Sequence, residues 1–356
     1  MKILHVVGAR PQLMKLHPLL KSLDRTEIIS KVLHTGQHFD TNMSDIFFDE
    51  MGIKNPDYHL NVRSSMVSKM LDKITDILIK DNFDTVFVYG DTNSTVAGAL
   101  AGRQLGLKVI HYESGVRNLD PSMPEEINRI IVDRISDILL CVSDECLTNL
   151  QNETCWYDAK LYKTGDLMYD SFLEFMPNKI NENQISDNSI QKVISSNEKY
   201  IYVTVHRASN TDNRDNLKDI LSSLCTINKD IKVIFPVHPR TREAMDKYSL
   251  SVDFELFNPI GYTESLSLIQ NCDFVITDSG GVVRESYWAD KPSILLLKNP
   301  LWPELVDLDA CINCSPEYSL IMNSYEKISS LNPKFNSGVY GDGNSAKIIR
   351  DLLQKK

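Results

Sequence analysis

Two carboxylates follow apolar runs that have the character of neighbouring strands, at the point where each run ends. Asp91 comes directly after TVFVYG, and Glu113 comes directly after KVIHY. The segment PEEINR then adds Glu125 and Arg129. Because open parallel sheets bind ligands at the carboxyl ends of their strands, acids that gather there are candidates for proton transfer or ligand binding. Any one of these acids is as well explained as a solvated loop residue or a helix cap, but the set favours a catalytic site.

A second segment has the features of an anion-binding turn. The apolar run FVIT leads into Asp278, Ser279, Gly280 and Gly281, where a helix is predicted to begin. Glycines let the backbone approach a ligand, while free N–H groups and the helix dipole favour phosphate. Glu285 would lie one helical turn further on, where a carboxylate can accept hydrogen bonds from a ribose diol. Helix caps also use Ser and Gly for structural reasons, so this motif alone is weak evidence.

Cations and imidazoles stand at other predicted strand ends. Arg10 and Lys15 lie at the start of the first predicted helix, in GARPQLMK, and are candidate phosphate or sugar contacts. His206 and Arg207 follow a strand in VTVHRASN, and His238 ends another in FPVHPRTR. A lone histidine on a strand is more often a core residue. Here both histidines end strands that point at the same predicted cleft, and each is followed closely by an arginine, so we predict ligand binding, more strongly for His206.

Length, composition and charge limit the classes of function. A chain of 356 residues exceeds one ordinary core and predicts two domains. The net charge of −10 argues against nucleic acid or an anionic membrane as a partner, because both favour a basic surface. No apolar stretch approaches the roughly 20 residues of a membrane span, and MKILHVVGARPQ has the pattern of a strand rather than a signal peptide. We therefore expect a cytoplasmic protein.

Seven scattered cysteines, an odd number, suit reduced thiols in a reducing compartment. Cys311 and Cys314 form a lone CxxC with no second CxxC or histidine pair. We therefore expect neither a redox pair nor a metal site there.

Short apolar runs alternate with helical segments along the whole chain, from KILHVV, TVFVYG and ILLCVS to KYIYVTVH, KVIFPVH and DFVITDS. This alternation predicts parallel sheets covered by helices on both faces. An Asn- and Ser-rich stretch, PNKINENQISDNSIQ, separates the two halves. We expect an α/β fold of two Rossmann-like domains facing each other across a cleft. The predicted parts are an N-terminal domain over 1–168, a C-terminal domain over 169–338, and a helix within 339–356 that packs back on the first domain.

Taken together, these segments resemble the non-hydrolysing UDP-N-acetylglucosamine 2-epimerase family over nearly the whole chain. Nine motifs in family order carry the resemblance: GARPQLMK, TGQHFDTNM, YGDTNSTVAGALAG, HYESGVR, MPEEINR, TVHRASNTDN, PVHPRTR, TDSGGVVRES and YGDGNSAKII. The resemblance implies a glycosyltransferase-B-like fold, a homodimer, and a UDP-sugar substrate inverted at C2 without a redox cofactor, for surface polysaccharide precursors. It also implies that a base removes the C2 proton while UDP leaves C1, and that UDP then returns to the 2-acetamidoglucal intermediate.

The resemblance assigns roles to individual residues. It implies catalytic roles for four residues: Asp91, Glu113, Glu125 and His206, the last near the diphosphate. It implies substrate-binding roles for nine others: Arg10, Lys15, Arg129, Arg207, His238, Ser279, Gly280, Gly281 and Glu285. In some bacterial members the substrate is also an allosteric activator, and Gln37, His38 and Met43 stand in the corresponding element.

Three departures from the family pattern bear on the substrate. Ser209 replaces the usual Glu of HRxE, Val283 replaces the usual Gln after SGG, and residues 298–302, KNPLW, replace Arg-Asp-x-Thr-Glu. The sequences ARPQ and QHFDTNMSDIFFDEMGI also resemble the branch of the family that acts on modified UDP sugars. UDP-N-acetylglucosamine is therefore the first expectation, and a diacetamido uronate or 6-deoxy UDP sugar is the alternative.

Three other kinds of protein stay open. A hydrolysing relative would release the free sugar, but its first loop is GTRAD-like, whereas this chain has GARPQ. A transferase of the same fold and a sugar-binding regulator are the others. Three acids at the strand ends of the first domain argue against both, because a binder gains nothing from burying unpaired carboxylates.

Overall fold

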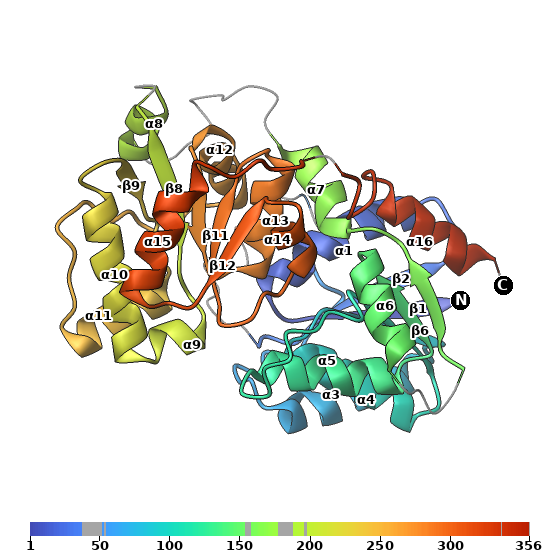
Figure 1. Ribbon diagram of the computed structural model, residues 1–356. Helices are drawn as coiled ribbons and strands as arrows, with labels where there is room; N and C mark the ends of the chain where they lie inside the picture. Colours follow the sequence, from blue (N-terminus) through green and yellow to red (C-terminus); the bar gives the residue numbers. More distant parts are fainter. Residues whose placement is uncertain are drawn as a thin grey trace. The chain divides into compact units, whose positions relative to one another are not determined.

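The computed structural model describes residues 1–37, 52, 55–153, 158–176, 188–195, 198–335 and 337–355. The chain forms two compact units. Unit 1 comprises Met1–Glu174 and Gly338–Lys356, and unit 2 comprises Phe175–Ser337. Each unit contains a parallel sheet with helices on both faces (Figure 1). The predicted α/β class with two parallel sheets is confirmed.

The sheet of unit 1 has seven parallel strands in the order β3-β2-β1-β4-β5-β6-β7. Their bounds are β1 Lys2–Val7, β2 Ile29–His34, β3 Tyr58–His59, β4 Thr85–Tyr89, β5 Lys108–Tyr112, β6 Ile138–Cys141 and β7 Lys160–Lys163. The helices of this part of the chain are α1 Arg10–Leu23, α3 Val67–Lys80, α4 Asn93–Gln104, α5 Pro124–Ile135, α6 Asp144–Asn152, α7 Leu167–Phe175 and α16 Ser345–Gln354. The strand order reverses between β1 and β4, the place where open sheets bind ligands.

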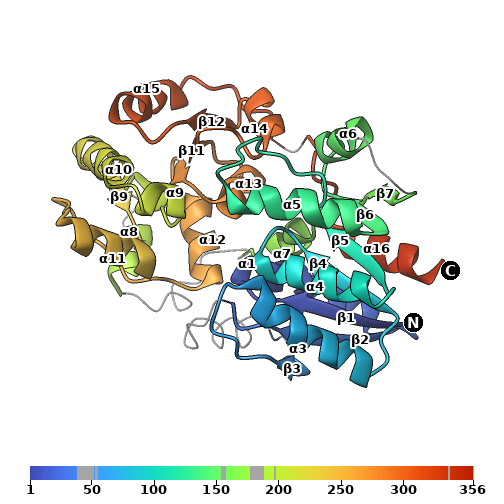
Figure 2. The same ribbon diagram turned by 90° about the horizontal axis from the view of Figure 1, so that it is seen from below.

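Helices α3, α4 and α5 lie side by side on one face of this sheet (Figure 2). Helix α4 approaches its strands closely because it carries Gly98 and Gly102. A Cβ atom at Gly102 would lie 2.8 Å from a methyl group of Val86, and one at Gly98 would lie 3.0 Å from Val88. The step from β1 to β2 runs opposite to that from β4 to β5, so right-handed crossovers place α1 on the other face. Helix α16 packs against α1.

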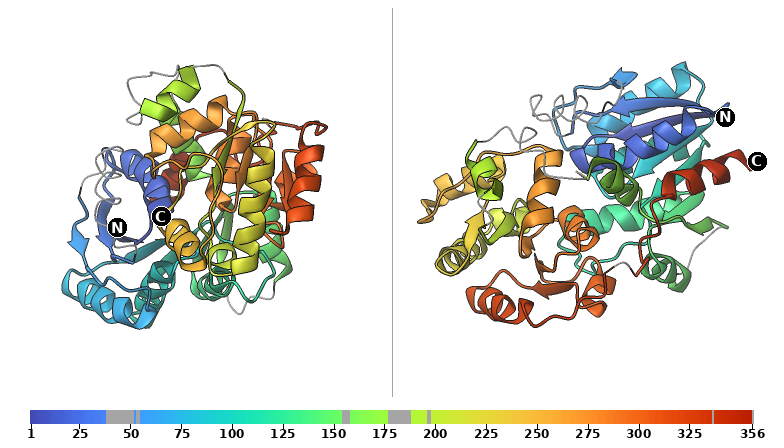
Figure 3. Two further views of the ribbon diagram at one scale, coloured as in Figure 1. Left: turned by 90° about the vertical axis from the view of Figure 1, so that its left-hand side faces the viewer. Right: turned by 90° about the horizontal axis from the view of Figure 1, so that it is seen from above.

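Unit 2 has a five-stranded parallel sheet in the order β12-β11-β10-β8-β9. Its strands are β8 Tyr200–Thr204, β9 Lys232–Ile234, β10 Val275–Thr277, β11 Ser293–Leu296 and β12 Cys311–Cys314. Its helices are α8 Asn188–Ser195, α9 Ala208–Thr211, α10 Arg214–Ile227, α11 Pro239–Tyr248, α12 Tyr262–Asn271, α13 Gly280–Trp288, α14 Pro303–Asp307 and α15 Tyr318–Ile328. Helices α10 and α15 lie side by side over one apolar cluster (Figure 3), and α8 and α12 contribute to another.

Within unit 1, the N-terminal segment and the returning C-terminal segment run close together at Gly165 and Gly341. Both glycines have positive φ, and a Cβ atom at Gly341 would lie 3.2 Å from the Cα atom of Gly165. Nearby, the Asp170 carboxylate accepts hydrogen bonds from the backbone N–H groups of Ser345 and Ala346 at the start of α16. These contacts attach the C-terminal helix to unit 1. The chain divides after Glu174, six residues beyond the predicted end of the first domain.

Candidate active site

Two of the three predicted acids of unit 1, Asp91 and Glu113, sit on tight turns that follow neighbouring strands. Strands β4 and β5 pair directly, and Gly90 and Glu113 come immediately after them. Both residues have positive φ, 60° for Gly90 and 67° for Glu113. A non-glycine residue rarely adopts this conformation, at a cost of about 1–3 kcal/mol, and such strain gathers at functional sites. Asp91 follows Gly90 and precedes Thr92, whose side chain caps α4.

Lys15 and Glu113 form a buried ion pair. Lys15 lies on α1, and its Nζ atom is 2.7 Å from Oε2 of Glu113. The turn at Gly90 packs against this pair, because a Cβ atom there would lie 3.3 Å from Nζ of Lys15 and 3.4 Å from Oε1 of Glu113. The predicted substrate contact Lys15 and the predicted catalytic Glu113 therefore lie in one site. Gly90 packs against both of them, and the space beside it leaves little room for a side chain.

Asp91 is paired with Arg129 of helix α5. The Arg129 guanidinium contacts Oδ2 of Asp91 at 2.5 Å and Oε2 of Glu126 at 2.7 Å. Burial acts to lower the pKa of Arg129, but Asp91 and Glu126 outweigh it and raise this pKa above its ordinary value. Asn128 donates to the backbone carbonyl of Asp91 and to Asn93. The segment EINR thus positions Asp91 from two sides.

Three other candidate residues of unit 1 lie at or against the starts of helices. Arg10 is half-buried at the first position of α1, and Glu125 is half-buried in the first turn of α5. Oε1 of Gln37 accepts hydrogen bonds from the N–H and the hydroxyl group of Ser94, at the start of α4. The other two candidate allosteric residues, His38 and Met43, lie outside the described residues.

In unit 2, the fully buried carboxylate of Asp278 organises the ends of β8 and β10. It accepts hydrogen bonds from the backbone N–H groups of His206 and Arg207 and from the side-chain amide of Asn210. The Arg207 Nε–H group donates back to the Asp278 carbonyl. His206 and Arg207 are held at this strand end, and the His206 imidazole is partly exposed beside the carboxylate, with Nδ1 3.6 Å from Oδ1.

The predicted anion-binding turn begins helix α13. Ser279 caps the helix by accepting from the N–H of Val282, so the structural role of this serine is real. The Gly280 carbonyl accepts hydrogen bonds from Nε1 of Trp302 and Nε of Arg284, and the Arg284 guanidinium lies 4.2 Å from the Trp302 ring centroid. A Cβ atom at Gly280 would lie 2.5 Å from Leu301.

Loop 298–302, whose sequence departs from the family pattern, therefore packs against this turn through Leu301 and Trp302. Gly281 and Glu285 lie on the same helix, Gly281 half-buried and Glu285 buried.

His238 caps helix α11 and stacks loosely beside His206. Its Nδ1 atom accepts from the N–H of Arg240, and the ring centroids of His206 and His238 are 5.5 Å apart. Two of the predicted imidazoles are therefore neighbours. The capping contact gives His238 a structural role in addition to any role in binding.

Sequence reasoning missed Gln12, which ties the first loop to the turn before Asp91. Its Oε1 accepts from the N–H groups of Gly8 and Ala9, and its Nε2 donates to the Tyr89 carbonyl and to the hydroxyl groups of Thr92 and Thr95. A buried amide that satisfies this many groups acts as a brace between two loops. The available signal was a polar residue at the start of a helix that otherwise buries leucines.

The cysteines of the CxxC motif are buried on strand β12. Burial raises the pKa of the Cys311 thiol to about 12 and also raises that of Cys314. A thiol with a raised pKa carries little thiolate, the reactive form. Among the described residues, no group of three or more His, Cys, Asp and Glu side chains is arranged to hold a metal ion. Nor does this part of the chain contain a helix long and apolar enough to cross a membrane.

Comparisons with known proteins agree on one family. A model of the family described as UDP-N-acetylglucosamine 2-epimerase matches residues 21–354. A UDP-N-acetylglucosamine 2-epimerase homolog of Methanococcus maripaludis is 41% identical, covering 99% of both chains. The UDP-2,3-diacetamido-2,3-dideoxy-D-glucuronate 2-epimerase of Pseudomonas aeruginosa is 37% identical over 100% of both chains.

A solved structure of UDP-GlcNAc 2-epimerase from Methanocaldococcus jannaschii, in complex with UDP-GlcNAc and UDP, aligns with a TM-score of 0.91. It is 32% identical and covers 100% of both chains. The enzyme from Neisseria meningitidis bound to UDP-GlcNAc aligns with a TM-score of 0.86 at 27% identity, again over 100% of both chains. A likeness to the spinosyn forosaminyltransferase SpnP, with a TM-score of 0.52 at 10% identity, extends to the fold alone. The glycosyltransferase-B-like fold expected from the sequence is confirmed.

Proposed function

Because this chain belongs to the UDP-N-acetylglucosamine 2-epimerase family, whose enzymes are isomerases, we propose that it interconverts UDP-N-acetylglucosamine and UDP-N-acetylmannosamine without hydrolysing them. The reaction proceeds by loss of the C2 proton and of UDP, followed by return of both to the 2-acetamidoglucal intermediate. It needs proton-transfer groups for two faces of the sugar and a site that retains UDP as a leaving group. We assign one kind of site to each unit.

Unit 1 supplies the proton-transfer groups. Asp91 and Glu113 sit on adjacent strand-end turns, and each carboxylate is located by a buried cation, Arg129 or Lys15. A fixed carboxylate can meet a C–H bond in the right geometry, and this placement lowers the barrier. Glu125, in the first turn of α5, is the third acid of the proposal. The supporting observation is the pair of charge-located carboxylates at the ends of β4 and β5.

Unit 2 supplies the UDP site in this proposal. The N-terminus of α13, with Ser279, Gly280 and Gly281, offers N–H groups to the diphosphate. Arg207 adds positive charge and His206 an imidazole, both held by Asp278, and Glu285 is placed to accept from the ribose. Together these groups stabilise UDP as it leaves and keep it available for return.

The first experiment incubates the purified protein with UDP-N-acetylglucosamine in deuterated water and follows the C2 proton and the anomeric phosphorus by NMR. We expect deuterium at C2 and a manno epimer still linked to UDP. Free N-acetylmannosamine with UDP would show a hydrolase, and transfer to an added sugar acceptor without C2 exchange would show a transferase. The absence of any exchange would contradict the proposed substrate.

A modified UDP sugar is the second candidate, and two observations favour it. The Pseudomonas aeruginosa relative, a UDP-2,3-diacetamido-2,3-dideoxy-D-glucuronate 2-epimerase, is 37% identical over the full length. In addition, loop 298–302 departs from the usual family sequence. Two of its residues, Leu301 and Trp302, lie against the turn at Gly280, so the departure falls beside the proposed diphosphate site. The same NMR assay with the diacetamido uronate and with a 6-deoxy substrate compares the rates of C2 exchange. The substrate with the highest kcat/KM identifies the branch.

A cytoplasmic homodimer completes the proposal, and helix α5 offers a surface for it. Ile127, Ile130 and Ile131 of this helix are exposed, between 37% and 44% of each residue, while Glu126, Arg129 and Asp133 are buried. Light scattering on a sizing column measures the mass of the native protein. We expect twice the chain mass, and Ile130→Lys is expected to weaken the dimer, with Ile348→Lys on α16 as a control. A monomer in the unsubstituted protein would contradict this part of the proposal.

Substrate activation through Gln37, His38 and Met43 stays a prediction. Its test is the initial rate as a function of UDP-N-acetylglucosamine concentration, in the native protein and in Gln37→Ala. A hyperbolic curve in the native protein would count against activation.

A further inference from the structure

His111 is a fully buried histidine of strand β5, two residues before Glu113. Its Nε2 atom lies 2.7 Å from the carbonyl oxygen of Gly90, and its Nδ1 atom lies 2.7 Å from Oδ1 of Asp133. Asp133 is equally buried, on helix α5. His111 therefore bridges the turn before Asp91 and the helix that carries Arg129.

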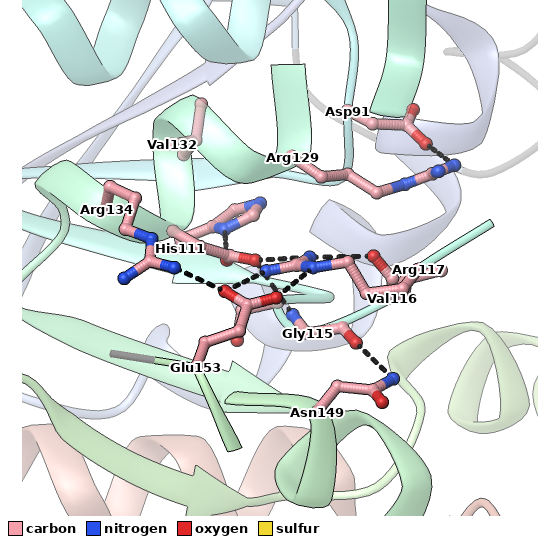
Figure 4. A network of polar contacts seen from close by, with 12 residues as sticks. Asp91, His111, Gly115, Val116, Arg117, Arg129, Val132, Arg134, Asn149 and Glu153 are labelled. Carbon is pink, nitrogen blue, oxygen red and sulfur yellow. Dashed lines mark hydrogen bonds and ion pairs between the residues drawn. The ribbon is translucent and has the colours of Figure 1, made fainter. Parts of the chain in front are cut away.

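The other oxygen of Asp133 binds the turn after Glu113. It accepts hydrogen bonds from the Gly115 N–H at 3.1 Å and from the Arg117 guanidinium at 2.8 Å. Arg117 in turn makes two hydrogen bonds to Glu153, to which Arg134 also donates (Figure 4). Burial acts to raise the pKa of Asp133, but His111 and then Arg117 outweigh it and lower this pKa below its ordinary value. Asp133 is therefore ionised at neutral pH.

The Gly90 carbonyl can only accept a hydrogen bond, so Nε2 of His111 carries the hydrogen in that contact. On the opposite side of the ring, Nδ1 faces the Asp133 carboxylate. The imidazole is therefore held between two partners, and both set its orientation.

The Gly90 carbonyl bears directly on Asp91. The Gly90 C=O and the Asp91 N–H belong to one planar peptide group, so fixing the oxygen fixes the plane from which the Asp91 side chain emerges. On its other side, the Gly90 N–H donates to the Tyr112 carbonyl, the last residue of β5. The position of Asp91 relative to Glu113 therefore depends on the bond that His111 makes.

We infer that His111 and Asp133 are positioning residues that set the distance and orientation between Asp91 and Glu113, one through the Gly90 carbonyl and the other through the Gly115 N–H. The inference rests on the proposed function for the roles of the two acids. Helix α5 acts as the common reference for the two loops, because Glu126, Arg129 and Asp133 are all buried on it. Arg129 binds Asp91 in the loop after β4, while Glu126 and Asp133 bind the loop after β5 at Asn118 and Gly115.

Two matched substitutions separate this role from a merely structural one. The amide nitrogen of Gln reaches about as far as Nε2 of His, and that of Asn about as far as Nδ1. His111→Gln can therefore keep the bond to Gly90 while losing Asp133, and His111→Asn can keep Asp133 while losing Gly90. If His111 only satisfies the buried charge of Asp133, Asn is the better replacement. If it positions Asp91, Gln is the better one.

The measurement is kcat and KM for C2 exchange in both variants, with melting temperatures recorded alongside. We expect His111→Asn to lower kcat by about 100-fold with KM within about twofold, since small misplacements of a catalytic group cost rates of this order. His111→Gln is expected to keep at least about tenfold more of the activity than His111→Asn. Equal kcat values in the two variants, or a loss confined to KM, would overturn the inference.

Crystal structures of the two variants give a readout that does not depend on activity. We expect the Gly90–Asp91 peptide to keep its orientation in His111→Gln and to rotate in His111→Asn. If this holds while the native protein exchanges C2 in no UDP sugar, the positioning role stands and the proposed function fails. An unchanged peptide in His111→Asn would overturn the positioning role.

Should His111→Asn fail to fold, Asp133→Asn replaces it, with Glu153→Gln at the far end of the network as its control. The inference requires a lower kcat in the first and native kcat in the second.

Discussion

Units 1 and 2 both place carboxylates at their strand ends, but the partners of these carboxylates differ. In unit 1, Asp91 and Glu113 are bound by the charged side chains of Arg129 and Lys15. In unit 2, the Asp278 carboxylate is bound at hydrogen-bonding distance by two backbone N–H groups and by the amide of Asn210. The same residue type therefore serves two purposes, because its surroundings differ.

The difference agrees with the proposed roles of these carboxylates. A carboxylate that binds backbone N–H groups orders the chain around it, and in unit 2 this carboxylate holds the backbone of His206 and Arg207 at the strand end. A carboxylate located by a cationic side chain is fixed by the charge of that side chain. We therefore assign proton transfer to unit 1 and anion binding to unit 2.

The largest expected effect comes from removing charge in unit 1. Glu113→Gln keeps the size of the side chain but removes its ability to take a proton, so kcat for C2 exchange should fall by about 10²–10⁴-fold. Calorimetry should find UDP binding within about twofold of native, because UDP is assigned to unit 2. Glu174→Gln, at an ion pair with Lys21 on the surface of unit 1, is the control. A parallel loss of UDP affinity in Glu113→Gln would erase the proposed division between the units.

Unit 1 also contains a buried histidine, His5, whose hydrogen-bond partners are neutral hydroxyl groups. It shows what burial costs an ionisable side chain that has no charged hydrogen-bond partner. His5 contacts Tyr89 and Ser30, and its burial lowers its pKa to about 3 despite the raising effect of Asp57. The unfolded chain, with an imidazole pKa near about 6.5, binds the extra proton first, so stability falls as pH falls from about 6.5 towards 3. The slope approaches about 1.4 kcal/mol per pH unit between about pH 6 and 4.

Urea unfolding at several pH values measures this slope, and His5→Gln should remove it. The slope should survive in His17→Gln, whose imidazole contacts the Glu174 carboxylate. Equal slopes in all three proteins would show that His5 carries no such penalty.

A smaller effect is expected from the scaffold carboxylate of unit 2. Asp278→Asn replaces one acceptor oxygen by a donor that faces N–H groups, which costs about 1–3 kcal/mol of stability. Because His206 and Arg207 lose their order, the Kd for UDP should rise while the kcat for C2 exchange at saturation stays close to native. Asp212→Asn, at an exposed ion pair with Arg240, should change neither quantity. A kcat loss as large as that of Glu113→Gln would place Asp278 among the reacting groups.

The smallest effect is expected at the CxxC of β12. Raised thiol pKa values keep Cys311 and Cys314 protonated at pH 8, so iodoacetamide should modify them slowly in the folded protein and quickly in urea. Peptide mass spectrometry before and after unfolding checks this. Rapid modification in the native state would reopen a redox role for this motif.

The acids of unit 1 and the turn of unit 2 could be predicted because parallel strands align their ends. The apolar runs before Asp91, Glu113 and Ser279 are short and continuous, as buried parallel strands require. Helix α5 shows where such reasoning stops. Isoleucines would ordinarily be expected inside, yet three of its four isoleucines are exposed, while Arg129 and Asp133 are buried. Polar partners that come from distant strands decide this orientation, and a local pattern does not contain them.

His111 and Gln12 escaped notice for a related reason. His111 is a single polar residue inside an apolar run, and Gln12 lies between two cations that drew the prediction, Arg10 and Lys15. Sequence spacing gives no sign of a partner 22 residues away, as for His111 and Asp133. Roles that rest on a side chain's own chemistry, such as a carboxylate at a strand end, are visible in the sequence. Roles that rest on holding another residue's backbone become visible only when the chain is folded.

The attachment of α16 to unit 1 has a consequence for biosynthesis. Unit 2 is one continuous stretch of chain, nested between the two segments of unit 1. As the chain leaves the ribosome, unit 2 can complete its core while the surface of α1 that α16 covers is still open. Unit 1 is finished only when the residues of α16 emerge, so a premature stop after Ser337 removes a structural part of unit 1.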